Sequence, residues 1–176
     1  DLTISVAQFA AGTDVDENLV ACQELIARAA ATSQLVVLPE YSMYADFGKT
    51  QPDRSHAEAL DGPFVTALRD TARAHGIAVV VGINETDADD DRVSNTLVHL
   101  SASGELAGVY RKIHLYDAFG FRESDTVIPA QIDSPLAFEL EGVRIGAATC
   151  YDLRFPEMSR WLVDQGADVI LPPAAW

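Results

Sequence analysis

Hydrophobic and polar positions in the first part of the chain predict a strand, a helix and a second strand. The run Leu2–Phe9 alternates apolar with small or polar residues and is rich in β-forming types, which indicates a strand. An apolar stripe at helical spacing then predicts a helix that Asp16 can cap. The stripe consists of Leu19, Cys22, Ile26 and Ala29. The continuous apolar run Leu35–Leu38 predicts a short buried strand, which Pro39 ends.

The middle of the chain continues with a helix and three strands. Pro63–His75 has a helical pattern, with proline suited to the first turn and Gly76 suited to the stop. Ile77–Ile83 is a third apolar strand. Val93–Leu100 and Leu106–Arg111 predict a hairpin, because residues 101–105 between them contain a turn glycine.

The last part of the chain contains another hairpin, a helix and a final strand. Leu136–Leu140 and Val143–Thr149 flank a Glu-Gly turn, Pro156–Gln165 predicts a helix, and Val169–Leu171 a strand. Residues 112–135 follow neither pattern, and so long a connection is typical of a functional loop. Strands interleaved with helices and hairpins predict a mixed sheet in an α/β layered domain.

The length and composition of the chain narrow its class. With 176 residues, 48% of them hydrophobic, the chain can build one core but not comfortably two, so we expect a single domain over residues 1–176. The sequence contains no apolar run of about 18 residues that could span a membrane. Its N-terminus lacks the basic-then-apolar layout of a secretory signal. We therefore expect a soluble protein.

Charge and cysteine content indicate which partners and which cellular location the protein can have. The chain carries 12 basic and 27 acidic residues, a net charge of −15, which repels nucleic-acid backbones and anionic membranes. We therefore expect neither nucleic acid nor membrane as a partner. Cys22 and Cys150 do not form a disulfide framework, which favours a reducing, cytoplasmic location.

Cys150 is the candidate nucleophile of the sequence. It follows an apolar strand and precedes a helix that starts at Pro156, and a strand-to-helix turn usually presents its side chain to a cleft. Taken alone, the pattern is more often that of an inert buried thiol. Cys22, on the apolar stripe of the first helix, is expected to be such a core residue.

A thiol nucleophile needs a base, and the best candidate is Glu40. The four histidines lie at positions with no Cys–His signature around them, and we expect them to be surface or packing residues. Glu40 follows the buried strand Leu35–Leu38, at the carboxyl edge of the sheet where α/β proteins bind ligands. A carboxylate serves as a base when its surroundings raise its proton affinity, although an exposed loop acid would fit the same position.

Lys112 is the candidate for stabilising a negative oxygen in the transition state. It follows the strand Leu106–Arg111, and an ammonium in a site sheltered from water does this strongly. Arg111 is its rival, but adjacent residues on a strand point to opposite faces, so only one of them can enter the site. The alternative is a solvated lysine at a strand end.

Together these three segments resemble the nitrilase superfamily of carbon–nitrogen hydrolases. The family's glutamate motif matches Leu38-Pro39-Glu40, its lysine motif matches Tyr110-Arg111-Lys112-Ile113-His114-Leu115, and its cysteine motif matches Cys150-Tyr151-Asp152-Leu153-Arg154-Phe155-Pro156-Glu157. The order of the three along the chain is also that of the family. The resemblance implies Cys150 as nucleophile, Glu40 as general base and Lys112 as the electrophilic helper.

The resemblance also implies the fold and the assembly. It runs from Val6-Ala7-Gln8 to Leu171-Pro172-Pro173-Ala174-Ala175-Trp176 and implies a four-layer α-β-β-α sandwich. Family members continue past this last strand, so we expect the C-terminal part of the fold to be missing here. Their subunits pair through helices that include the one after the cysteine turn. This implies a homodimer or higher homo-oligomer in which a partner partly covers Trp161 and Leu162. The alternative is that their own subunit buries these two residues.

Two further site residues are implied by the family. A second glutamate assists the triad from the loop after the lysine, and Phe121-Arg122-Glu123-Ser124 resembles its surroundings, which makes Glu123 the candidate. The backbone N–H of Tyr151 is expected to hold the oxyanion together with Lys112. Asp152, Arg154 and Glu157 are expected to hold the cysteine turn by pairing with one another or with the backbone.

The cysteine turn looks most like that of the branches that hydrolyse short linear amides, such as ω-amides of dicarboxylates and deaminated glutathione. N-carbamoyl amino acids and nitriles are alternative substrates, and a catalytically silent binding or assembly member of the family is the alternative to an enzyme. We expect no cofactor and no metal, because no cluster of His, Cys, Asp and Glu has ligand spacing. The acidic Asp87–Asp91 stretch lacks EF-hand spacing and predicts a solvated hairpin tip.

Overall fold

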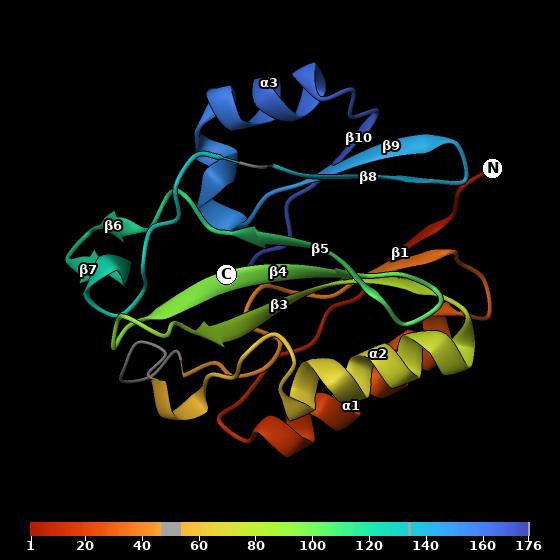
Figure 1. The fold of residues 1–176 in the computed structure, drawn as a ribbon, viewed down its shortest axis with the longest axis horizontal. Helices are drawn as coiled ribbons and strands as arrows, with labels where there is room; N and C mark the ends of the chain where they lie inside the picture. The colour runs from red at the N-terminus through yellow and green to blue at the C-terminus, as the bar shows by residue number, and fades with distance from the viewer. Residues whose placement is uncertain (47–53, 134, 176) are drawn as a thin grey trace.

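The computed structural model describes residues 1–46, 54–133 and 135–175, so Trp176 lies outside the described residues. Four layers follow one another in the order α-β-β-α, as Figure 1 shows. Helices α1 (Val15–Ala29) and α2 (Pro63–His75) cover one face of a five-stranded sheet. A three-stranded sheet packs on its other face, and α3 (Pro156–Asp164) covers the outside of that second sheet. The predicted four-layer sandwich is therefore confirmed.

The larger sheet is mixed, as its sequence pattern predicts. Its order is β1 (Ile4–Val6), β2 (Leu35–Val37), β3 (Ala78–Thr86), β4 (Val93–Leu100) and β5 (Leu106–Arg111). The first three strands are parallel and the last three antiparallel. The bounds predicted for β4 and β5 are confirmed. The first strand is much shorter than predicted, because only three of its residues pair with the equally short β2.

The smaller sheet has the order β10 (Val169–Leu171), β9 (Val143–Ala147) and β8 (Leu136–Leu140). The hairpin β8–β9 is antiparallel and β10 is parallel to β9. Residues 112–135, which show no regular sequence pattern, connect the larger sheet to the smaller one. They contain a small hairpin, β6 (Asp117–Ala118) and β7 (Phe121–Arg122), which lies to one side of the sandwich in Figure 1.

The N-cap of helix α1 lies two residues earlier than the sequence predicts. Asp14, not Asp16, is the N-cap, and its Oδ1 accepts hydrogen bonds of 3.0 Å from the backbone N–H groups of Asp16 and Glu17. The helix starts at Val15, so Asp16 lies inside the first turn, where its charge still favours the helix dipole. Helix α2 keeps its predicted bounds and ends at Gly76, whose φ of 64° suits glycine.

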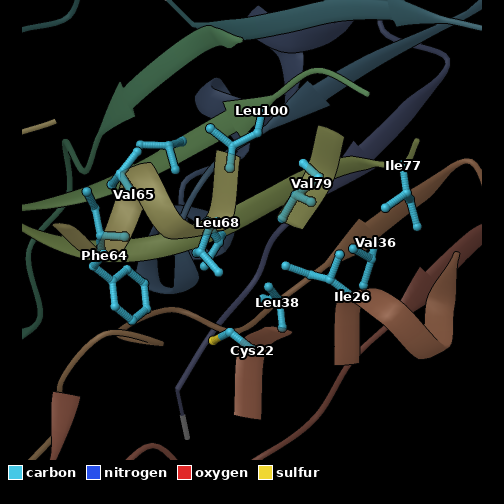
Figure 2. Close-up of a cluster of buried hydrophobic side chains, with 14 of the residues drawn as sticks. Cys22, Ile26, Val36, Leu38, Phe64, Val65, Leu68, Ile77, Val79 and Leu100 are labelled. Carbon is cyan, nitrogen blue, oxygen red and sulfur yellow. The ribbon is translucent and has the colours of Figure 1, made fainter. Parts of the chain in front are cut away.

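One apolar cluster lies between the two N-terminal helices and the larger sheet. Figure 2 shows Cys22 and Ile26 of α1 close to Leu38, with side chains of α2 beside them. All of these side chains are buried, so the predicted apolar stripe of α1 does face the core. Cys22 is completely buried, and burial raises the pKa of its thiol to about 12, which leaves it an unreactive core residue.

A second apolar cluster fills the space between the two sheets and extends to α3. Leu162 of α3 is fully buried by its own chain, so the expected partial cover by a partner is wrong for this residue. Trp161 is half-buried against the same cluster. In the described parts of the chain, no helix is both long and apolar enough to cross a membrane.

Candidate active site

The turn after β2 carries Glu40 across the larger sheet at a point where only glycine fits. A Cβ on Gly82 of β3 would lie 2.6 Å from Glu40 Cα, closer than real Cβ contacts come. Two hydrogen bonds fix this crossing, from Gly82 N to Pro39 O (3.1 Å) and from Ser42 N to Gly82 O (2.9 Å). The close approach places the Glu40 carboxylate between the two sheets with only 3% of the residue exposed.

Lys112 lies directly beside Glu40. It follows β5, is 2% exposed, and donates from Nζ to Glu40 Oε1 (3.0 Å) and to Glu123 Oε1 (3.0 Å) and Oε2 (2.9 Å). Burial alone would lower the pKa of the lysine, but the two carboxylates outweigh burial and raise it. Lys112 is therefore a fixed ammonium, and the structure brings together three of the residues that the sequence singled out.

Glu123 is held by more donors than Lys112 alone. It begins a short 3-10 helix (Glu123–Asp125), is buried, and accepts a hydrogen bond from the backbone N–H of Tyr116 (2.6 Å). The hydroxyl of Tyr41 donates to its Oε1 (2.8 Å). Burial and the nearby Glu123 and Glu40 carboxylates raise the pKa of Tyr41, so this phenol stays protonated and remains a donor.

Sequence reasoning missed Asn95, which joins the two carboxylates. Its Nδ2 donates to Glu40 Oε1 at 2.7 Å and to Glu123 Oε1 at 3.3 Å, from a fully buried position on β4. The sequence offered only an amide side chain inside a predicted strand. The structure shows that this strand is buried along its whole length, where such a polar group needs a partner.

Arg111 lies on the opposite face of the sheet, as strand alternation predicts. Its Nε donates to Glu85 Oε2 at 2.7 Å, and the same oxygen accepts from the hydroxyl of Thr96. Glu85 is the neighbour of the inward-facing Asn84 on β3 and points away from the site. Arg111 is therefore excluded as a rival of Lys112 for contact with Glu40.

Cys150 occupies a strained turn after the smaller sheet. It begins the 3-10 helix Cys150–Arg154 with φ 48°, a left-handed conformation that costs a non-glycine residue energy and is found preferentially at functional sites. Its backbone N–H donates to Pro173 O (2.9 Å). Burial, followed by the charge of Glu40, raises the pKa of the thiol to about 12, against the opposing effect of Lys112. Cys150 is thus a neutral thiol beside a carboxylate.

Asp152 ties the cysteine turn to the residues on either side of Lys112. Its fully buried carboxylate accepts from Thr149 N (2.9 Å), Tyr110 Oη (2.6 Å) and His114 N (3.1 Å), and His114 Nδ1 lies 2.7 Å from Oδ1. The expected bond to the turn backbone is present. The expected pairing within the turn is not what holds Asp152, since its side-chain partners come from β5 and the segment after it.

Two aromatic rings flank the ring of Tyr151. Its ring lies edge-on to Tyr116 (centroids 5.0 Å apart) and to Phe155 (5.5 Å), and Phe155 in turn stacks on His114 (3.7 Å). The Tyr151 N–H lies in the first turn of the 3-10 helix, where backbone donors have no helical acceptor. The Glu40 carboxylate receives one more donor from this region, Ala175 N to Oε2 at 2.9 Å.

Metal ligation has no candidate in the residues described here, since none of their His, Cys, Asp and Glu side chains form a group of three or more suited to an ion. At the acidic hairpin tip, Asp90 is engaged by Arg92 (Nη2 to Oδ2, 2.7 Å), and these hydrogen bonds lower the pKa of Asp90 to about 2.

The known proteins that this chain resembles are hydrolases. The sequence profile of the carbon–nitrogen hydrolases matches residues 3–176. The chain is 40% identical to hydrolase Rv0480c of Mycobacterium tuberculosis (99% of this chain, 61% of that protein). It is 35% identical to deaminated glutathione amidase of Escherichia coli O157:H7 (99% and 66%). The chain thus spans less than two thirds of these relatives.

Solved structures of an amidase from the nitrilase superfamily have a similar fold. An amidase from a Nesterenkonia species superposes with a TM-score of 0.84 at 27% identity, over 98% of this chain and 64% of that one. In a variant of that amidase, the acetamide moiety of fluoroacetamide is covalently attached to the active-site cysteine.

Proposed function

This chain belongs to the carbon–nitrogen hydrolase family, and we propose that the protein is a cysteine-dependent amidase that hydrolyses a short linear amide. One observation carries the proposal: the Lys112 ammonium is held between the carboxylates of Glu40 and Glu123, and the thiol of Cys150 lies within their field. Nucleophile, base and fixed positive charge are the three parts that acyl transfer from an amide needs.

In the first half of the proposed cycle, the Cys150 sulfur attacks the amide carbonyl while Glu40 takes the thiol proton. A base is required because a thiol with a pKa of about 12 is almost entirely protonated near neutral pH. Lys112 and the N–H of Tyr151 stabilise the oxyanion. Glu40 then returns the proton to the departing nitrogen, so ammonia leaves and a thioester remains on Cys150.

In the second half, Glu40 takes a proton from water, whose oxygen attacks the thioester. The carboxylic acid product leaves and the proton returns to the Cys150 sulfur, which restores the starting state. Glu123 holds Lys112 in place throughout, since both of its oxygens accept from Nζ. We therefore assign Glu123 to orienting the ammonium and not to proton transfer.

The choice of amides over other substrates rests on the relatives. Deaminated glutathione amidases from two bacteria and from cattle match over at least 98% of this chain, at 31–35% identity. The same chemistry would act on N-carbamoyl amino acids, which offer a similar carbonyl and are the second candidate. Nitriles are the third, because the triad can also add to a carbon–nitrogen triple bond.

A substrate panel tests the proposal. The full-length protein is incubated with ω-amides of dicarboxylates, N-carbamoyl amino acids and simple nitriles, while ammonia release and the mass of the acyl group on Cys150 are measured. We expect turnover of the ω-amides and a thioester on Cys150 only. Selective turnover of nitriles or carbamoyl compounds would contradict the amidase assignment and leave the triad intact.

Cysteine variants separate the enzyme from a silent family member. Cys150→Ala should abolish turnover, whereas Cys22→Ala should not, because Cys22 lies on the core-facing side of α1. Equal losses in both variants would contradict the assignment of the nucleophile. A wild-type protein without activity on any class would favour the binding or assembly role. We further propose a cytoplasmic homo-oligomer, and sedimentation of the full-length protein as a monomer would contradict the assembly.

A further inference from the structure

A row of polar side chains runs across three neighbouring strands under the Glu40 carboxylate. Asn84 on β3 is the register partner of Asn95 on β4, and Lys112 N donates to Asn95 O (2.9 Å) on the far side. Side chains alternate along a strand, so Asn84 shares a face with Ala78 and Val80, which belong to the core between the two sheets. All three polar side chains therefore face the same interior layer.

The hydrogen bonds of this row are incomplete at one end. Asn84 and Asn95 are both 0% exposed. Asn95 Nδ2 is occupied by the two glutamates, but Asn95 Oδ1 and both amide atoms of Asn84 have no hydrogen-bond partner among the described residues. A buried amide without partners destabilises the folded state, and such groups in proteins nearly always bind protein atoms or water.

The orientation of Asn95 explains what is needed there. Two carboxylates lie on one side of its amide, and carboxylates accept hydrogen bonds, so Nδ2 must face them and Oδ1 must face the other way. Asn84, whose two amide atoms also lack partners among the described residues, is the register partner of Asn95 on the neighbouring strand. Side chains in such a pair have Cβ atoms about 5 Å apart, a separation that one molecule able to both donate and accept can bridge.

We propose that Asn84 and Asn95 form the binding site of a buried water molecule, and that Asn84 is a positioning residue for Glu40 and Glu123 through Asn95. The water donates one hydrogen bond to Asn95 Oδ1. It forms its other hydrogen bonds with the Asn84 amide, so it has the two or more polar partners that a buried water requires. It thereby holds the Asn95 amide with Nδ2 toward the glutamates. The water site is independent of the reaction, whereas the positioning role rests on the proposed function.

A crystal structure of the full-length protein at high resolution, together with one of Asn84→Leu, tests the site. We expect a density peak within about 3.2 Å of Asn95 Oδ1 and of an Asn84 amide atom in the wild type, and no such peak in the leucine variant. A direct bond between the two amides, or a protein atom in place of the peak, would overturn the water site.

Kinetics test the positioning role. Asn84→Leu should lower kcat roughly tenfold with KM changed by less than about twofold, because the substrate still binds while the carboxylates lose a fixed donor. Asn84→Ser keeps a hydroxyl that can bind the same water and should recover most of that loss. Ile83→Val is the matched control, since it perturbs the same strand on the opposite face and should lower the melting temperature alone.

The outcomes separate the two claims. Wild-type kcat in Asn84→Leu, or an equal fall in kcat for Ile83→Val, would overturn the positioning role. Turnover of no amide by the wild-type protein would refute the proposed function, and the density between Asn84 and Asn95 would still decide the water site.

Discussion

The substitution Glu40→Gln removes one negative charge beside the Cys150 thiol and leaves the side-chain shape nearly unchanged. The carboxylate raises the pKa of this thiol by its charge and by hydrogen bonding, while Lys112 lowers it. With glutamine, burial still raises the pKa of the thiol, but the charge of Glu40 no longer adds to it against Lys112. We therefore expect two effects of opposite sign: more thiolate at rest, and less turnover.

The size of the first effect follows from the pKa of about 12. At about pH 8, roughly one Cys150 thiol in ten thousand is ionised. A neighbouring charge within a site shifts a pKa by about one to three units, so Glu40→Gln should raise the thiolate fraction roughly ten- to a thousandfold. Turnover should fall at least about a hundredfold, since the positioned acid–base group is lost.

The thiolate is measured by its ultraviolet absorbance between about pH 8 and 10, in a Cys22→Ala background so that the signal comes from Cys150 alone. Turnover is measured on the best ω-amide. Glu85→Gln is the matched control, because this buried glutamate lies on the opposite face of the larger sheet from Glu40, where it pairs with Arg111. It should change neither quantity.

Two results would refute the reasoning. An unchanged or smaller thiolate fraction in Glu40→Gln would mean that the carboxylate does not act on the thiol as the structure indicates. Near wild-type turnover would remove Glu40 from the mechanism whatever the thiolate fraction.

Three further predictions concern stability and metal. Asp152→Asn should lower the free energy of unfolding by about 2–3 kcal/mol in denaturant titrations, because it leaves buried donors without their charged acceptor; a wild-type value would contradict the network. His99 is buried against Phe138, and burial lowers its pKa from 6.5 to about 4. Protonation of His99 therefore favours unfolding, and the free energy of unfolding falls as the pH drops below about 6.5. At pH 5 the wild type should have lost about 2 kcal/mol more than His99→Phe. The same pH dependence in the wild type and in His99→Phe would refute this. Chelator treatment should leave turnover unchanged, and loss that zinc restores would contradict a metal-free mechanism.

Most of the secondary structure could be predicted because its signals are local. The proline and glycine at the two ends of Pro63–His75 and the turn glycine between β4 and β5 define these elements within a few residues. The first strand was overestimated for a non-local reason: its length is set by the three residues of β2 that it pairs with. Likewise, the N-cap of α1 depends on where the chain enters the helix. Asp14 and Asp16 lie two residues apart, and an aspartate at either position could cap a helix that starts there.

Some residues of the site could likewise be predicted from the sequence, and one could not. Glu40, Lys112, Cys150 and Glu123 were singled out by motif and by position at strand ends, and the structure places the two glutamates on the lysine. Asn95 was missed, because a single asparagine in a strand does not reveal whether it faces a carboxylate or only the second sheet.

The sequence by itself determined the elements, the mixed α/β class and, through three ordered motifs, the family, since each of these is encoded in short windows of periodicity or residue type. The tertiary structure alone decided which charges meet. Glu40 and Lys112 are 72 positions apart, and Asn95 reaches both glutamates only because β3, β4 and β5 lie side by side. Burial and the nearby Glu40 carboxylate then raise the pKa of Cys150, because the cost of a charge depends on the atoms around it and not on its neighbours in sequence.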